Sequence, residues 1–487
     1  MKIVVNNIVT KVISGGHDDL HSPGVFNGLR DYLSVDVPGA WFSPQYKKKI
    51  WDGKKYFLTP TGKMATGFLP FLLKHLDRDY PDLPVELIDD RGPMPAFKEQ
   101  FISTIGSIEV NDEYEHQKRS IQAMDAHINF RGISLPFPRG VLNAATNAGK
   151  TAVIAGVHLN LVGSPTMLVL IHRKTIFDQL VEAFEDVYGK VGIISATKYD
   201  PKDITIGMIK TVYNRLTKSV NVKKDLAGFD VVAVDEAHLA GSKTYVKVLL
   251  NTPAPVRVFV SGTPFDSDAI VNKMLAIGSS GPELIHVSKR ELMDKGISLE
   301  AKIHIHLCNE PIALDGNWEL ARHNKIHNSA KRVGIMSEII HNHDGSTLIA
   351  VKEIEHGHLL CTGLQLMGNK SITFVHGTDP ERVQKIEDFK TGKIKTLIST
   401  TILKEGVNIP IISNVINAVG GKSKVDIKQW MGRGERRHEG LKSFTMHDFY
   451  DIGRYVEAHS KVRIATYRKE KLDVTLHYAK EDIKKIK

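Results

Sequence analysis

The feature that most constrains the fold is a series of short apolar runs that alternate with helical stretches from about residue 139 onward. The runs are GVLNA, TMLVLIH, DVVAVDE and VRVFVSG, followed by STLIAV, SITFVHG, KIKTLIST and NVINAV. They lack strict polar alternation, which indicates strands buried on both faces, and the helical stretches between them supply the crossovers of a parallel sheet. The sequence therefore predicts an α/β fold.

Sequence patterns also identify two of the crossover helices. The stretch KTIFDQLVEAFEDVYG, residues 174–189, is amphipathic and lies between two strand runs. Further along, Asp379 is predicted as an N-cap and Pro380 as the first residue of a helix that continues through ERVQKIEDFK. The strand runs form two groups, separated by a charged, His-rich region at residues 317–345. Two consecutive α/β domains are therefore expected.

The first 105 residues or so differ from the rest of the chain. They lack the alternation of strand and helix, and they contain many turn residues, as in SGGHDD, DVPGAW, TPTG and DDRGPMP. We expect them to form a separate small α+β domain.

Composition excludes several classes of protein. The two cysteines, Cys308 and Cys361, form neither a disulfide framework nor a CxxC metal-ligand pair. The N-terminus lacks the layout of a signal peptide, and no apolar run approaches the roughly 20 residues that span a bilayer. A net charge of +10 over 487 residues favours a polyanionic partner. These properties predict a cytoplasmic protein that does not enter the membrane.

The stretch AATNAGKT, residues 144–151, follows the first strand run and begins a helix. In such a loop, backbone N–H groups and the positive end of the helix surround the β-phosphate of a nucleotide. Lys150 is predicted to supply a cation to the β and γ phosphates, and Thr151 a hydroxyl to Mg²⁺. Ala144 and Asn147 stand where glycine is usual, but Ala144 is small and Asn147 tolerates a left-handed backbone. The other loop residues predicted to contact ATP are Thr146, Ala148 and Gly149.

A second acidic motif, DVVAVDEAHLA, lies about 85 residues after Lys150. Asp235 ends its strand and is predicted to hold Mg²⁺, while Glu236 orients or deprotonates the attacking water. His238 is predicted to relay to the second domain. Together with the phosphate loop, these residues complete both halves of a nucleoside triphosphate site.

The third motif is QWMGRGERR, on a helix predicted to begin near Asp426. Arg433 and Arg436 are three residues apart, so they share one face of the helix or its immediate end. The planar guanidinium group of arginine suits the charge that develops on a transferring γ-phosphoryl group. Both arginines are therefore predicted to be catalytic.

From about residue 110 to 455, this ordered set of motifs resembles the superfamily 2 helicases and translocases. The resemblance implies two RecA-like motor domains, with ATP and Mg²⁺ in the cleft between them. It assigns adenine recognition to Gln117 and Tyr114 in DEYEHQKRSIQAM, and ATP contacts to Glu405 and Gly406 in STTILKEGVNIP. Residues that couple hydrolysis to domain movement would be Ser261, Gly262, Thr263 and Gln429. Contacts to nucleic acid would come from His172, Arg173, Lys210, Thr211 and Thr401.

The N-terminal segment FSPQYKKKIWDGKKYFL, followed by MATGFLPFLLKHL, is similar to the small domain of the UvsW-type phage helicases, which remodel branched DNA. Its lysines bracket Trp51 and combine phosphate-neutralising charge with an aromatic surface. Alternatively, Trp51 belongs to the core and the lysines form a solvated rim. The predicted DNA contacts here are Lys47, Lys48, Lys49, Trp51, Lys54 and Lys55.

The predicted organisation is an N-terminal DNA-binding domain at 1–105, motor domains at 106–300 and 301–455, and a basic tail at 456–487 that includes Lys480, Lys484 and Lys485. We expect an ATP-dependent helicase acting on branched DNA such as Holliday junctions, forks or R-loops. The expected form is a monomer, in the host cytoplasm if a phage encodes it. Two alternatives remain: an RNA helicase, although SGTP replaces the SAT-type motif common there, or a nucleic-acid-binding protein with an impaired ATPase.

Overall fold

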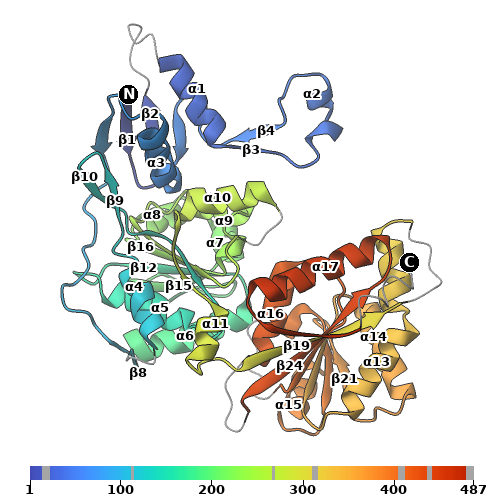
Figure 1. The fold of residues 1–487 in the computed structure, drawn as a ribbon. Coiled ribbons are helices and arrows are strands. Elements are labelled where there is room, and N and C mark those ends of the chain that lie inside the picture. Colours follow the sequence, from blue (N-terminus) through green and yellow to red (C-terminus); the bar gives the residue numbers. More distant parts are fainter. Residues whose placement is uncertain are drawn as a thin grey trace. The chain divides into compact units, whose positions relative to one another are not determined.

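The computed structural model describes residues 1–13, 22–110, 114–265, 269–309, 316–403, 412–435 and 441–478 (Figure 1). The chain divides into two compact units, Met1–Val287 and Ser288–Lys487. Each unit contains one large sheet with helices packed against it, so the predicted α/β fold with two successive sheets is confirmed.

The large sheet of the first unit has the strand order β14-β13-β15-β12-β16-β17-β11-β18. Its pairings are parallel except for that between β13 and β14. The strands are β11 (Arg139–Ala144), β12 (Met167–Ile171), β13 (Gly192–Ile194), β14 (Tyr199–Asp200), β15 (Ile204–Met208), β16 (Val231–Asp235), β17 (Val256–Ser261) and β18 (Glu283–Val287). The helices of this part are α4 (Glu115–Gln122), α5 (Lys150–Leu159), α6 (Lys174–Tyr188), α7 (Ile209–Leu216), α8 (Val220–Ala227), α9 (Lys243–Leu249) and α10 (Ile270–Ser280).

Burial on both faces explains the continuous apolar runs of this sheet. In β12, Val169 belongs to the hydrophobic cluster on one face, whereas Leu168 and Leu170 belong to the cluster on the other. All five residues of β12 are buried. The four runs predicted as strands in this unit are β11, β12, β16 and β17, and the helix predicted at 174–189 is α6.

The N-terminal residues form a four-stranded sheet of order β5-β2-β1-β6. Its strands are β1 (Lys2–Val5), β2 (Val9–Ile13), β5 (Lys63–Ala65) and β6 (Glu86–Asp89), accompanied by α1 (Ser22–Tyr32) and α3 (Leu69–Asp79). The core of this sheet continues into Val271, Met274, Leu275 and Ile277 of α10. Arg139, which is buried, donates hydrogen bonds to the carbonyls of Asn7, Ser279 and Ser280. The N-terminal sheet and the first large sheet therefore share one compact unit.

The sheet of the second unit is parallel throughout, in the order β21-β22-β20-β23-β24-β19-β25. Its strands are β19 (Glu300–Cys308), β20 (Thr347–Ala350), β21 (Ile372–Val375), β22 (Thr396–Ser399), β23 (Asn414–Asn417), β24 (Ser443–Asp451) and β25 (Asp473–His477). Its α-helices are α11 (Lys289–Asp294), α12 (Trp318–Arg322), α13 (Ala330–His341), α14 (Ile354–Leu366), α15 (Arg382–Lys390), α16 (Lys424–Gly434) and α17 (Arg454–Lys469). Strands β20 to β23 are the four runs predicted from the sequence.

Two predictions for this unit are corrected by the structure. The segment predicted as a basic tail from residue 456 instead contributes most of α17 and all of β25, which pairs with β19. Its Lys480, Lys484 and Lys485 lie outside the described residues. Helix α15 begins at Arg382 rather than Pro380, because the Asp379 carboxylate accepts the backbone N–H of Glu381 and holds a turn before the helix. Among the described residues, no helix has the length and apolar character needed to cross a bilayer.

Candidate nucleotide and nucleic-acid sites

The predicted site residues of the first unit follow the carboxyl ends of adjacent parallel strands. The phosphate loop follows β11, the SGTP motif ends β17, and the acidic pair ends β16. The candidate nucleic-acid contacts follow β12 and β15, which are the next two strands of the sheet. Because these strands are parallel, all five segments lie along one edge, where open α/β sheets bind their ligands.

The phosphate loop contains the left-handed backbone conformation that the sequence analysis expected at Asn147. Asn147 and Gly149 have φ angles of 69° and 72°, both in the left-handed region. Gly149 is the N-cap of α5 and has no side chain with which to cap this end of the helix. A Cβ atom at Gly149 would lie 2.1 Å from Nε2 of Gln117, so a side chain here would displace Gln117, and the left-handed φ by itself favours glycine. The loop can therefore present backbone N–H groups to a phosphate group.

Helix α4 packs against this loop through two neighbouring side chains. Gln117 is 3% exposed and donates from Nε2 to the carbonyl of Ala148 at 3.3 Å. Its Oε1 atom is buried without a hydrogen-bond partner among the described residues, and an exocyclic amino group such as that of adenine would satisfy it. Nε2 of His116 lies 3.1 Å from the same carbonyl. The sequence analysis did not single out His116, although its place beside Gln117 on α4 is the signal that would have found it.

Tyr114 immediately precedes α4, and its ring centroid lies 6.3 Å from that of His116. The ring is half-buried. The structure therefore places the proposed adenine-stacking residue next to the phosphate loop, through its contact with His116.

The acidic pair is held by local backbone geometry at the end of β16. The Asp235 carboxylate accepts the N–H of Glu236 at 2.9 Å, and Glu236 has a φ of 60°. A left-handed backbone is uncommon outside glycine, and such conformations gather at functional sites. The Glu236 carboxylate lies 3.1 Å from Nδ1 of His238. The turn thus directs two adjacent carboxylates to different partners.

The charges around the pair separate the two carboxylates in pKa. Burial and the neighbouring charge of Glu236 raise the pKa of Asp235 to about 6. Burial also acts to raise the pKa of Glu236, but the hydrogen bond from His238 and the charge of Lys150 lower it to about 2. Because Lys150 stabilises the ionised form of both carboxylates, the structure brings Lys150, Asp235 and Glu236 into one electrostatic site. Such a site suits Mg²⁺, which proteins usually hold by one or two carboxylates together with substrate phosphates.

His172 belongs to this site as well as to the predicted nucleic-acid edge. Its positive form would lower the pKa of both Asp235 and Glu236, and Nε of Arg173 donates to its ring at 3.1 Å. Lys210 and Thr211 occupy the first turn of α7, where Lys210 is exposed.

The SGTP motif packs directly against the phosphate loop. A Cβ atom at Gly262 would lie 3.2 Å from the carbonyl oxygen of Ala144. Thr263 is 4% exposed and its N–H donates to Oγ of Ser261 at 3.2 Å. Of the predicted coupling residues, Gly262 therefore lies against the loop whose state it is expected to sense.

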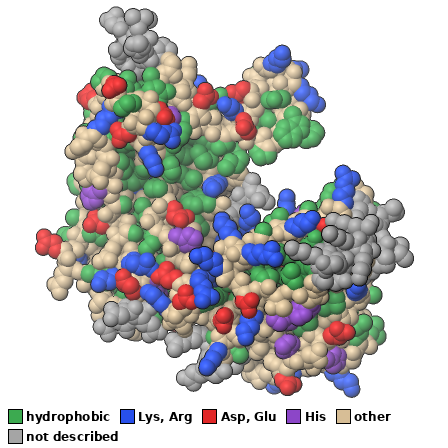
Figure 2. Space-filling model, in the orientation of Figure 1, with side chains coloured by type: hydrophobic (Ala, Val, Ile, Leu, Met, Phe, Trp, Pro, Cys, Tyr) green, Lys and Arg blue, Asp and Glu red, His purple; other side chains and the backbone are tan. Residues whose placement is uncertain are grey.

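The predicted DNA-contacting lysines of the N-terminal region lie on an apolar, basic tip. The tip comprises the hairpin β3 (Ser34–Asp36) and β4 (Lys54–Tyr56) and the short helix α2 (Pro44–Lys47) between them, and it projects from the N-terminal sheet (Figure 1). Lys47, Lys48, Lys49 and Lys55 are exposed. Trp41, Phe42 and Ile50 are 58%, 73% and 74% exposed, and Figure 2 shows apolar and basic side chains together on this lobe.

Two residues of the tip are constrained by other contacts. Trp51 is half-buried, and its indole N–H donates to the carbonyl of Lys54 at 2.7 Å. It lines an open pocket of about 560 Å³ with Trp41 and Tyr46. The ammonium of Lys54 lies 3.5 Å from the carboxylate of Asp31. Lys47, Lys48, Lys49 and Lys55 are consequently better placed than Lys54 for contact with a polyanion.

In the second unit, the structure places only some of the predicted residues. Ser423 caps α16 by accepting the N–H of Asp426, so the arginine helix begins slightly before the predicted position. Gln429 and Arg433 lie on α16, where Arg433 is 8% exposed. Thr401 begins a short 3₁₀ helix. Glu405, Gly406 and Arg436 lie outside the described residues.

Comparison with known proteins gives two matching families in chain order. The family described as "Type III restriction enzyme, res subunit" matches residues 112–266, and "Helicase conserved C-terminal domain" matches residues 331–438. These ranges contain the phosphate loop, the acidic pair and the arginine helix.

Two curated relatives resemble this chain over more than half of its length. The "ATP-dependent DNA helicase uvsW" of Enterobacteria phage T4 is 23% identical over 88% of this chain and 87% of its own length. The "Putative mitochondrial ATP-dependent helicase irc3" of Schizosaccharomyces pombe is 23% identical over 66% of this chain, which spans only 55% of that protein. Among solved structures, Saccharomyces cerevisiae Dbp5 bound to RNA and ADP BeF3 has a TM-score of 0.50 at 17% identity, and covers 76% of this chain and 91% of its own.

Proposed function

This chain belongs to superfamily 2 of the ATP-dependent helicases, and from that membership we propose that it is a DNA translocase that remodels branched DNA. The observation that carries the DNA assignment is the exposed basic and apolar tip of the N-terminal region. Similarity to the phage T4 DNA helicase over most of both chains supports the same assignment.

In this proposal, the edge of the first sheet binds ATP and Mg²⁺. The phosphate loop and Lys150 hold the β and γ phosphates, with Thr151 and Asp235 as the ligands for Mg²⁺. Bound Mg²⁺ supplies positive charge beside the transferring phosphoryl group. Glu236, which follows Asp235 at the end of β16, orients the attacking water and accepts its proton. Arg433 and Arg436 neutralise the charge that develops on the γ-phosphoryl group.

Selectivity for branch points requires a second contact beyond the motor motifs, because those motifs grip a nucleic-acid backbone irrespective of its shape. The tip meets this need in two ways. Its exposed lysines neutralise phosphate groups, and its exposed Trp41 and Phe42 offer faces on which unpaired bases can stack. The shared core with α10 holds the region that bears the tip at a fixed place on the first unit.

The test is a comparison of junction binding across a series of salt concentrations. Replacing Lys47, Lys48 and Lys49 with alanine should weaken binding to a four-way DNA junction. It should also make the salt dependence shallower, by about 0.9 in the log–log slope for each DNA phosphate that the protein no longer neutralises. ATPase activity stimulated by single-stranded DNA should persist, because the substitutions leave the phosphate loop unchanged.

A matched control replaces three exposed lysines elsewhere on the first unit: Lys218, Lys223 and Lys224. The chain loses the same charge in this variant, so its junction affinity separates a local contact from a general electrostatic effect. An unchanged slope in the tip variant, or an equal loss in both triple variants, would contradict the assignment of the tip.

A further inference from the structure

A buried ion pair joins the beginning of α11 to the end of α16 in the second unit. Its members are Lys289 and Glu435, whose side chains are 4% and 0% exposed. Lys289 is the first residue of α11, and Glu435 is the C-cap of α16. Lys289 lies outside the sequence motifs, and Glu435 is a position between the two arginines of the QWMGRGERR motif.

Stability alone does not account for such a pair. Removing two charges from water is costly, and a well-packed apolar pair in the same place is often equally stable or more so. A buried pair does, however, define one arrangement of the elements that carry it, because displacing either partner leaves an uncompensated charge. The position of the end of α16 is thereby tied to that of α11.

Other contacts fix the end of α16 in the same place. The N–H of Leu299 donates to the carbonyl of Glu435 at 3.0 Å. A Cβ atom at Gly434 would lie 2.2 Å from the ring of Phe444 in β24, so the helix packs closely on this strand. Arg433 precedes these residues on the same helical turn, and Arg436 follows Glu435 in the chain.

The chain just before Lys289 is bonded to the phosphate loop of the first unit. Val287 ends β18, and its carbonyl accepts the N–H of Ala145 at 3.2 Å. Only Ser288 separates Val287 from Lys289, and Oγ of Ser288 caps α11 by accepting the N–H of Glu291. Within the three residues 287–289, Val287 thus contacts the phosphate loop and Lys289 contacts the end of α16.

We propose that Lys289 and Glu435 are positioning residues for ATP hydrolysis. Their ion pair fastens the end of α16, which bears Arg433, to the segment that follows β18, and β18 ends in a hydrogen bond to the phosphate loop. A change in the loop is passed along this segment to Arg433 and Arg436. The proposal rests on the proposed function, in which those arginines stabilise the transferring phosphoryl group. It predicts a contribution to turnover that is separate from ATP affinity.

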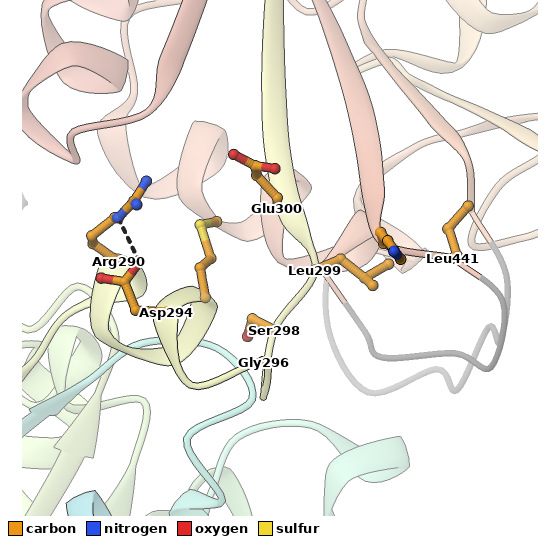
Figure 3. A pocket seen from close by; sticks show the side chains of 9 residues that line it. Arg290, Asp294, Gly296, Ser298, Leu299, Glu300 and Leu441 are labelled. Carbon is orange, nitrogen blue, oxygen red and sulfur yellow. Dashed lines mark ion pairs between the residues drawn. The ribbon is translucent and has the colours of Figure 1, made fainter.

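Helix α11 also provides a matched control. Arg290 and Asp294 form an exposed ion pair at 2.9 Å, with side chains 51% and 56% exposed. They line an open pocket of about 420 Å³ beside Ser298, Leu299 and Glu300, at the start of β19 (Figure 3). Exposed pairs of this kind contribute little to stability, so removing this one takes two opposite charges from α11 without touching the buried pair.

The experiment uses the full chain with four variants: Lys289→Met/Glu435→Leu, Lys289→Met, Lys289→Arg, and the control Arg290→Met/Asp294→Asn. Each is measured for thermal unfolding, for affinity towards a fluorescent ATP analogue, and for kcat at saturating ATP and single-stranded DNA. The buried double variant should fold and bind nucleotide within about two-fold of the parent, while its kcat falls at least about ten-fold. Lys289→Arg should retain most of the turnover, and the exposed double variant should match the parent.

The results separate this proposal from the proposed function. A parent protein without ATPase activity would contradict the proposed function itself. An active parent with an equally active buried double variant would overturn only the positioning role. A double variant that fails to fold, or one that loses nucleotide affinity and turnover in parallel, would assign the pair to stability and would likewise overturn the proposal.

Discussion

Glu236 illustrates how much chemistry a single backbone conformation can arrange. Its left-handed φ of 60° turns its carboxylate towards His238, while Asp235 remains at the strand end. The sequence identified both carboxylates through their place after a strand, but it did not reveal the turn. Burial acts to raise both pKa values; they separate because the charge of Glu236 also raises that of Asp235, whereas the hydrogen bond of His238 lowers that of Glu236.

This arrangement makes a prediction for Glu236→Gln and Lys150→Ala. Glutamine has the same shape as glutamate but cannot accept the proton of the attacking water, so Glu236→Gln should bind ATP and hydrolyse it very slowly. Lys150→Ala should abolish ATPase activity, because the β and γ phosphates lose their cation. Both variants should keep the DNA affinity of the parent in a filter-binding or anisotropy measurement. Near-normal turnover in either variant would show that its role is wrongly assigned.

Among the strands, those that could be predicted from the sequence were buried on both faces. They are β11, β12, β16, β17 and β20 to β23. Their mainly apolar runs can be recognised without knowledge of the residues that pack against them. Strand β19 was not predicted, because in KIHIHL apolar residues alternate with histidines instead of forming a continuous apolar run. In the structure these histidines pack against side chains of the neighbouring strands. His306 stacks on His477 of β25 and is bonded to His447 of β24. Neighbouring strands thus bury side chains that the sequence presents as polar.

Helix α17 was mistaken for part of a tail because its basic residues look solvated in the sequence. Arg463 is 1% exposed, and its guanidinium group contacts the carboxylates of Asp448 and Asp451 in β24 at 3.0 and 3.5 Å. A second buried pair joins Asp451 to Arg332 of α13. A basic residue is rarely buried without polar partners, and no pattern within the helix itself shows that the carboxylates that pair with Arg463 lie in β24.

These contacts predict that α17 is required for the stability of the second unit. Arg463→Met leaves the buried carboxylate of Asp448 without its arginine and removes one of the two arginines of Asp451, and should lower the free energy of unfolding by about 3 to 5 kcal/mol. Lys461→Met, which removes an ammonium that is 61% exposed, is the control and should change it by less than about 1 kcal/mol. Urea unfolding followed by circular dichroism measures both. Equal free energies of unfolding for the two variants would show that the contacts of α17 do not stabilise the second unit.

At the scale of the whole molecule, the order of motifs along the chain was a better guide than any single motif. The phosphate loop, the SGTP motif and the acidic pair are dispersed over more than a hundred residues, yet parallel topology brings them to one sheet edge. The sequence also indicated a separate N-terminal domain. It did not show that this region shares its core with α10 and contacts Arg139, because those contacts depend on residues far apart in the chain.

The proposed action on branched DNA is tested most directly by the rate at which the full chain unwinds four substrates of matched length and sequence in the presence of ATP. These are a four-way DNA junction, a DNA fork, a linear DNA duplex and an RNA duplex, each tested with Mg²⁺ and ATP and with the Glu236→Gln variant as the inactive control. We predict that the junction and the fork are unwound fastest, the linear duplex more slowly and the RNA duplex least, and that the variant unwinds none of them at a comparable rate. Equal rates on all four substrates, or fastest unwinding of RNA, would contradict the proposed action on branched DNA.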